Sequence, residues 1–199
     1  MKKTFLVAAV VLTTVAFAAA QRVNLKFDSE SEQFKESAME YTTIWKAEGD
    51  KIIAAMEKVS GIRFEETDIR AIVYEGVSWS GRRGSSPMKM RASYPRDTKK
   101  ATLVHELGHR HIAELYIENP EIDEHRALFL FLYDVWTELY GKDFADAQVA
   151  VEKRRRGVYP EAWDWALAMT RAGRDKTFRG IVVTTVKKKP GSVQLLDVN

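Results

Sequence analysis

Residues 102–115 read TLVHELGHRHIAEL, and this stretch determines how the rest of the chain is interpreted. Its apolar residues predict a buried helix. Because a helix advances about 100° per residue, His105 and His109 lie nearly above one another, with Cβ atoms about 5–6 Å apart. Two imidazoles so placed can hold one zinc ion at about 2.0–2.1 Å. Glu106 lies beside this face, where a carboxylate can accept a proton from a metal-bound water.

A glycine inside this helix carries a further signal. Gly108 costs about 1 kcal/mol relative to alanine in a helix interior. We therefore expect another segment of the chain to pack closely against it.

The segments on either side of the helix predict an α+β fold. Residues 88–94 alternate in polarity, which is typical of a half-exposed strand at a sheet edge. Strands are also predicted at 62–64, 69–74 and 180–186, and the polar segment 21–30 predicts no regular structure. Helical spacing and capping signals mark residues 31–58, 97–118, 120–140, 144–156 and 160–169. We expect a small antiparallel or mixed sheet with an edge strand next to the histidine helix, followed by a mostly helical C-terminal half.

Length and composition predict a single domain. The chain has 199 residues, of which 45% are hydrophobic and 30% charged, as in ordinary globular proteins. We divide it into an N-terminal helix (31–58), a core around the histidine helix (60–140), a helical part (142–186) and a tail (187–199). The sequence contains no cysteine, which excludes disulfides and cysteine-ligated metals.

The first twenty residues predict an export signal. Lys2 and Lys3 precede an apolar run, and residues 18–20 are alanines, so a signal peptidase would leave Gln21 as the first residue. The run is shorter than the about 20 apolar residues of a spanning helix. We therefore expect a secreted or periplasmic protein with no membrane span after cleavage. Cleavage leaves 29 of the 31 basic residues against 28 acidic ones, a balance that does not favour nucleic acid as a partner.

The strand at 88–94, the HELGH motif at 105–109 and the helix after it together resemble the zincin metallopeptidases. The resemblance covers roughly residues 60–140, and the five-residue motif is its specific part. It implies that Glu106 is the general base, that zinc polarises the scissile carbonyl, and that a peptide or protein substrate binds along the edge strand. On this strand the resemblance assigns substrate binding to Met88, Met90 and Ala92.

A catalytic zinc site uses three protein ligands, and the third has no clear signature here. The metzincin branch places a histidine after a glycine shortly beyond the motif, whereas residues 110–115 read RHIAEL. The gluzincin branch takes a glutamate from the next helix, often with an aspartate four residues later, but Glu124 is followed there by Leu128. Periodicity places His125 on the apolar face of that helix and Glu124 at its margin. His125 is thus the ligand inferred from the pattern, Glu124 the one implied by the gluzincin resemblance, and Glu121 or another carboxylate a further alternative.

Three other features of the sequence bear on the site. His111 lies about 200° from His109 around the helix, which predicts a position at the surface or behind the metal ligands. Tyr159, expected in a loop, is a candidate to stabilise the oxyanion, a role that a tyrosine or histidine commonly has in zincins. The basic run at 153–156 is interpreted as the solvated C-terminal end of a helix.

The leading hypothesis is hydrolysis of peptide bonds outside the cytoplasm by a zinc metallopeptidase, with a metal-activated water and Glu106 as general base. An alternative is a catalytically inactive zincin-like binding or structural domain of the cell envelope, although a pure scaffold has no need of Glu106. In a third, the motif is coincidental in an envelope-surface module, which only the basic stretches 153–156 and 187–189 favour. Substrate sequence and oligomeric state have no signature in this chain.

Overall fold

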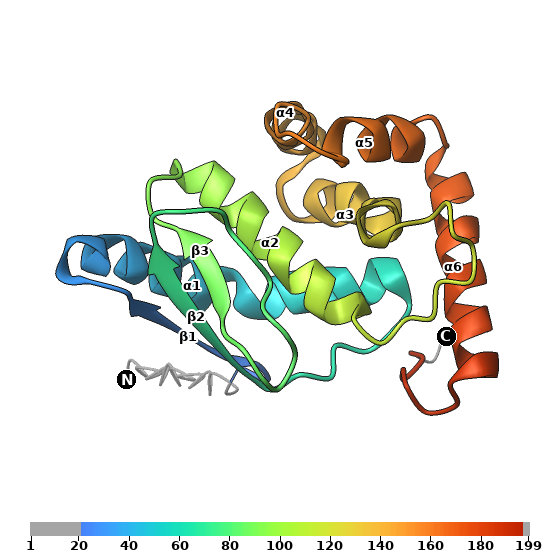
Figure 1. Ribbon diagram of the computed structural model, residues 1–199, viewed down its shortest axis with the longest axis horizontal. Coiled ribbons are helices and arrows are strands. Elements are labelled where there is room, and N and C mark those ends of the chain that lie inside the picture. The colour runs from blue at the N-terminus through green and yellow to red at the C-terminus, as the bar shows by residue number, and fades with distance from the viewer. Residues whose placement is uncertain (1–20, 197–199) are drawn as a thin grey trace, which may run out of the picture.

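The structure is a computed structural model that describes residues 21–196 (Figure 1). The predicted export signal, residues 1–20, lies outside the described residues. The elements are, in order, β1 (Asn24–Ser29), the 3-10 helix η1 (Glu32–Phe34), α1 (Lys35–Ser60), β2 (Asp68–Tyr74), β3 (Met88–Arg91), α2 (Arg96–Ile112), α3 (Glu124–Tyr140), α4 (Lys142–Glu152), α5 (Tyr159–Leu167) and α6 (Arg171–Lys188). The expected α+β class and helical C-terminal half are confirmed. Within residues 21–196, no helix combines the length and the hydropathy that crossing a bilayer requires.

The sheet has three strands in the order β1-β2-β3, and both neighbouring pairs are parallel. The expectation of an antiparallel or mixed sheet is therefore wrong. Parallel strands need a connection of a dozen or more residues, which α1 supplies between β1 and β2 and residues 75–87 supply between β2 and β3. The segment 21–30, expected to be irregular, contains β1. Only Leu25 of this strand is buried, so the alternation of β1 is weak in the sequence.

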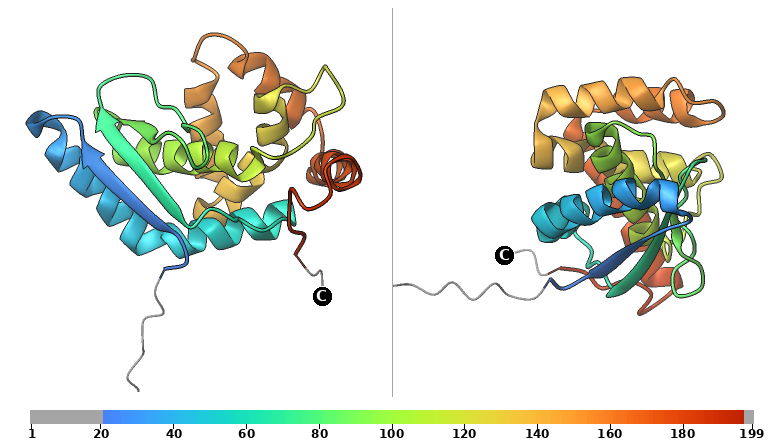
Figure 2. Two further views of the ribbon diagram at one scale, coloured as in Figure 1. Left: turned by 60° about the horizontal axis from the view of Figure 1, so that its bottom comes forward. Right: turned by 90° about the vertical axis from the view of Figure 1, so that its left-hand side faces the viewer.

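One face of the sheet carries the helices. In β2, Ile69, Ala71 and Val73 are buried, whereas Asp68 and Arg70 are exposed. Helix α1 packs against β1 and β2, and α2 packs against β3 (Figure 2). Period-two alternation thus places the apolar side chains under two helices and the charged ones in solvent.

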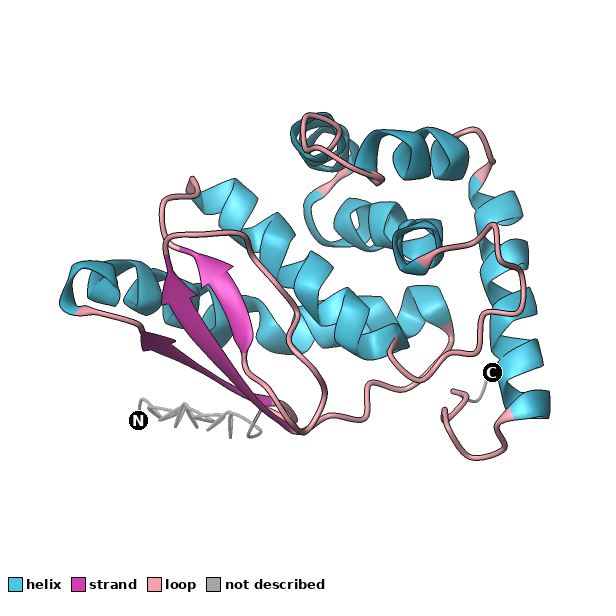
Figure 3. Cartoon of the chain, in the orientation of Figure 1, coloured by secondary structure: helices cyan, strands magenta, loops and turns pink. Residues whose placement is uncertain are grey.

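Helix α3 is the centre of the second half of the molecule (Figure 3). It contacts α1, α2, α4, α5 and α6. Residues 128–132, LFLFL, are all buried, as expected for a helix that is apolar on every side. Its first turn, capped by the Asp123 side chain through the backbone N–H of Arg126 at 2.8 Å, faces α2.

Several boundaries differ from those predicted. Helix α2 ends at Ile112 rather than near 118, and α3 begins at Glu124 rather than at 120. The segment 62–64 forms only a single bridge, between Ile62 and Leu195, after α1 has ended at Ser60 with Gly61 as its C-cap at φ 73°. The predicted strand at 180–186 is part of α6. Part of the predicted tail (187–199) is tied to the domain, because the backbone N–H of Leu196 donates to the carbonyl of Gly61 at 3.0 Å.

Candidate metal centre

The two motif histidines face one another on α2. Their Nε2 atoms are 3.2 Å apart, and His105 is fully buried and His109 7% exposed. Two nitrogens bound to one tetrahedral zinc at about 2.0–2.1 Å would themselves lie about 3.3–3.4 Å apart. The helix therefore holds the nitrogen pair at the spacing that a shared zinc ion requires.

A carboxylate lies behind each of these rings. His109 Nδ1 is 2.8 Å from Oε1 of Glu124, and His105 Nδ1 is 2.8 Å from Oε1 of Glu152. Glu152 is 2% exposed and its other oxygen accepts a hydrogen bond of 2.9 Å from the indole N–H of Trp163. Metal-ligating histidines usually have such a partner, because it fixes the tautomer and leaves the opposite nitrogen free for the metal.

His125, at the start of α3, completes a group of three. One ring nitrogen of each of His105, His109 and His125 lies within 4.8 Å of the others. The ring centroid of His125 is 4.9 Å from that of His109 and 5.8 Å from that of His105. Glu124 is instead on the far side of the His109 ring. The arrangement favours His125 as third ligand and gives Glu124 the position of a supporting carboxylate.

Burial keeps the third histidine of the group neutral. Burial lowers the pKa of His125 to about 4, with further contributions from His109 and His105. Burial also depresses the pKa of His105, but the Glu152 carboxylate outweighs it and the net direction is upward. Metal ligation requires neutral imidazoles. His125 meets this condition at neutral pH.

Glu106 and Tyr159 lie beside the histidines. Glu106 is 4% exposed, and burial raises the pKa of its carboxyl group above the usual range against the opposing effect of His105 and His109. Tyr159 was expected in a loop but is the first residue of α5, with its ring centroid 4.5 Å from that of His125.

Arg155 contacts both the ring and the hydroxyl group of Tyr159. The guanidinium of Arg155 is 5.2 Å from the centre of the Tyr159 ring, and its Nη1 donates to the Tyr159 hydroxyl oxygen at 3.5 Å. Burial raises the pKa of Tyr159 to about 12, so the phenol stays protonated at neutral pH.

The group opens into a cleft of about 700 Å³. Glu106, His109, His125 and Tyr159 line one part of it, and residues 78–83 line another. Glu106, His109 and His125 are therefore reachable from solvent through a space of the size typical of ligand-binding clefts.

The edge strand does not present its main chain in the expected way. Met88 and Met90 of β3 are fully buried, and Ala92, just after the strand, donates its N–H to the carbonyl of Tyr74 at 2.8 Å, so the residues assigned to substrate binding are turned towards the core or towards β2. On the outer side, Lys89 is already paired with Trp79 in an antiparallel bridge. Substrate binding by Met88, Met90 and Ala92 stays a prediction, and residues 78–83 lie between this strand and the cleft.

Three positions were missed or misplaced by sequence reasoning. Glu152 ends α4 and Arg155 lies in the turn after it, so no sequence spacing relates them to the motif on α2, and the run at 153–156 was interpreted only as a helix end. His111 is 8% exposed but supports no ligand: its Nε2 lies 2.8 Å from Ser60 Oγ and its ring stacks on Phe64. Its side chain instead packs α2 against the end of α1.

The donor set fits zinc. It consists of three imidazoles on two helices, with no thiolate and with a carboxylate behind two of the rings. Borderline nitrogen ligands of this kind suit zinc, and three protein ligands with an open cleft are typical of catalytic rather than structural sites. Comparisons with protein-family models, with curated proteins and with solved structures find no match for this chain.

Proposed function

We propose that this chain is an exported zinc metallopeptidase of the zincin type, with Glu106 as general base. The observation that carries the proposal is the pair of Nε2 atoms of His105 and His109, 3.2 Å apart, each ring having a carboxylate 2.8 Å from its Nδ1 atom. A carboxylate close to the Nδ1 atom of each ring is the arrangement that metal-ligating histidines usually have. The position of His125 supports a three-histidine set.

A zinc ion held by the three histidines would act as a Lewis acid that polarises the scissile carbonyl and acidifies the attacking water. Glu106 accepts the proton of that water and then delivers it to the leaving amine nitrogen. Its raised pKa brings the carboxyl group closer to neutral pH, where it can both take up and release a proton. The Tyr159 hydroxyl, protonated at neutral pH, donates a hydrogen bond to the carbonyl oxygen as negative charge develops there.

The test uses the chain from Gln21, loaded with zinc, and an unbiased peptide library read by mass spectrometry. Glu106→Gln is expected to keep zinc and to lose hydrolysis by a factor of about 10²–10⁴. Glu36→Gln makes the same chemical change at an exposed position of α1 and should keep both properties. Normal turnover by Glu106→Gln would refute the mechanism. Zinc and peptide binding by the wild-type chain without any turnover would favour the inactive binding domain instead.

The export part of the proposal depends on residues 1–20. N-terminal sequencing of the protein recovered outside the cytoplasm is expected to begin at Gln21.

A further inference from the structure

Residues 78–86 form one side of the cleft, and we call them the cleft wall. Residues 78–83 and Ser85 line the same space as Glu106 and His125. The sequence of this segment, SWSGRRGSS, contains two glycines and suggests a mobile loop. Its hydrogen bonds indicate the opposite.

The beginning of the cleft wall is fastened to β3. The N–H of Trp79 donates to the carbonyl of Lys89 at 2.9 Å, and the N–H of Lys89 donates to the carbonyl of Trp79 at 2.8 Å. One step further along the strand, the N–H of Arg91 donates to Ser78 Oγ at 3.1 Å. The wall thus starts as a short extension of the sheet.

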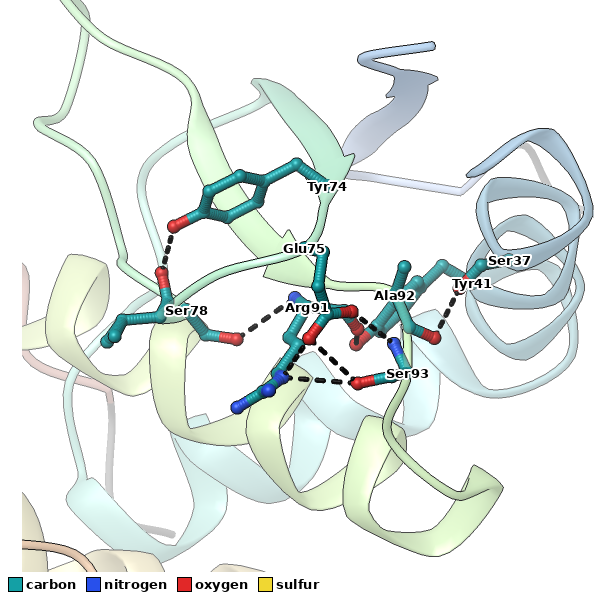
Figure 4. A network of polar contacts seen from close by, with 9 residues as sticks. Ser37, Tyr41, Tyr74, Glu75, Ser78, Arg91, Ala92 and Ser93 are labelled. Atoms are coloured by element: carbon teal, nitrogen blue, oxygen red, sulfur yellow. Dashed lines mark hydrogen bonds and ion pairs between the residues drawn. The ribbon is translucent and has the colours of Figure 1, made fainter. Parts of the chain in front are cut away.

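The turn before the wall is also held, as Figure 4 shows. The carboxylate of Glu75 accepts hydrogen bonds from the Nε of Arg91 and from both the N–H and the hydroxyl of Ser93. On the far side of the strand end, Tyr41 and Ser37 of α1 donate to the carbonyls of Arg91 and Ala92. The strand that carries the wall is therefore fixed from both sides.

Arg110, the residue after His109 on α2, holds the rest of the cleft wall. Its Nε donates to the carbonyl of Ser80 and its Nη2 to that of Ser86, each at 2.8 Å. Its Nη1 is 2.8 Å from both carboxylate oxygens of Glu66. Arg110 is 5% exposed, so these charge-assisted bonds are shielded from water. One turn of α2 thus carries a histidine of the metal group and holds the wall.

The side chain that this rigid wall presents is Trp79. Trp79 is 46% exposed although both of its main-chain polar groups are hydrogen-bonded. The other residues of the wall that line the cleft are serine, glycine or arginine. An aromatic ring held by a fixed backbone offers a large apolar contact at small entropic cost. The described part of the chain thus leaves nearly half of Trp79 open to solvent.

We propose that Trp79 is a specificity-determining residue that packs against a large apolar side chain of the peptide substrate, and that Arg110 is the positioning residue that holds it there. This inference rests on the proposed metallopeptidase function. It assigns substrate selection to the cleft wall rather than to β3, because the cleft wall already pairs with the outer edge of β3.

The test compares wild type, Trp79→Ala, Trp79→Phe and Val77→Ala on matched peptides that differ only in carrying Phe, Leu or Ala at one position. Trp79→Ala is expected to lose at least tenfold of the preference for Phe and Leu over Ala, mainly through KM. Trp79→Phe should keep most of it. Val77 is 80% exposed on the same connection but does not line the cleft, so Val77→Ala should behave as wild type. Unchanged selectivity in Trp79→Ala would overturn the inference.

A binding measurement separates this inference from the proposed function. The same peptides are titrated into zinc-loaded Glu106→Gln with and without Trp79→Ala, so that affinity is read without hydrolysis. If no variant hydrolyses peptides but Trp79→Ala weakens binding of the Phe peptide alone, the specificity role stands and the enzymatic role fails. If wild type hydrolyses peptides and the two affinities are equal, the enzymatic role stands and Trp79 is not the determinant. Absence of any peptide binding overturns both.

Arg110→Lys tests the positioning role. Lysine can still pair with Glu66 but has no rigid fork with which to reach two carbonyls as well. We expect KM for the Phe peptide to rise about as much as in Trp79→Ala. The value of kcat should fall by a smaller factor than KM rises, and the zinc content should be retained. In the Trp79→Ala background Arg110→Lys should reduce selectivity little further, because the side chain that Arg110 positions is already absent. Additive losses of selectivity would show that Arg110 does not act through Trp79.

Discussion

At the scale of single residues, the carboxylates behind the histidines decide which ring nitrogen faces the cleft. A carboxylate beside Nδ1 favours the proton on that atom and leaves the Nε2 lone pair for a metal. The two carboxylates differ in their surroundings, since the Glu152 side chain is 3% exposed and the Glu124 side chain is 63% exposed. Solvent screens the second far more than the first.

This difference predicts a ranking of zinc affinities. Glu152→Gln keeps the volume of the side chain but removes a buried charge, and should weaken zinc binding about 10–100-fold. Glu124→Gln should weaken it less, because water already screens that carboxylate. Competition with a chromophoric chelator measures both affinities. Equal affinities in wild type and Glu152→Gln would show that the carboxylate does not tune the site.

His111 shows how burial alone sets a residue's chemistry. Burial lowers the pKa of this ring to about 3, whereas in an unfolded chain it is about 6.5. Between these values the unfolded chain binds a proton that the native ring does not. Stability should therefore fall as the pH is lowered from about 6.5 towards 3, and this loss is absent above pH 6.5.

His111→Gln removes this titration. We expect the stability of wild type relative to the variant to decrease by about 2 kcal/mol between pH 7.5 and pH 5. Urea denaturation of both proteins with EDTA present measures the difference free of metal binding. A constant difference across this range would contradict the assignment of His111 as a buried neutral ring.

At the scale of elements, the site depends on how closely α2 and α3 approach each other. The expectation that something packs against Gly108 is supported, because a Cβ there would lie 2.5 Å from Cδ1 of Leu128. Leu128 is fully buried and lies one turn after His125 on α3. Gly108 thus lets the third histidine reach the other two.

Gly108→Ala should therefore destabilise the protein by about 1–2 kcal/mol, since overpacking outweighs the gain in helix propensity. In a Leu128→Ala background the clash is absent, and the same change should stabilise by up to about 1 kcal/mol. Gly180 of α6 has no atom within 4 Å of its Cβ position, so Gly180→Ala is the matched control and should stabilise in both backgrounds. Denaturant unfolding of the metal-free proteins measures the cycle. The same sign for Gly108→Ala in both backgrounds would contradict close packing at this point.

Elements were predictable where periodicity was strong and not where it was weak. The long helices gave clear patterns, whereas β1 buries a single apolar side chain fully and was missed. The run at 180–186 is rich in β-branched residues and predicted a strand. It is helical because Phe178, Ile181, Val182 and Thr185 bury one side of α6, which packs on α3. Tertiary packing there outweighs local propensity.

At the scale of the whole molecule, the candidate site is assembled from four helices. Two histidines come from α2, the third from α3, the buried carboxylate from α4 and the tyrosine from α5. The sequence predicted the first pair from its spacing and His125 from the apolar face of its helix. It could not predict Glu152, because nothing local relates a residue at the end of α4 to a ring on α2. Only the packing of α4 and α5 on α3 brings them together.

Because the proposed metal site exists only when these helices are packed together, the zinc content of the purified protein tests it most directly. The chain from Gln21 is purified, supplied with zinc, dialysed and analysed by plasma mass spectrometry, together with His125→Ala and Glu121→Ala. Glu121 is an exposed carboxylate just before α3 and was, after Glu124, a further alternative ligand from the sequence. The account predicts one zinc per chain in wild type and in Glu121→Ala, and much less in His125→Ala. A wild-type chain that binds no zinc under these conditions would contradict it.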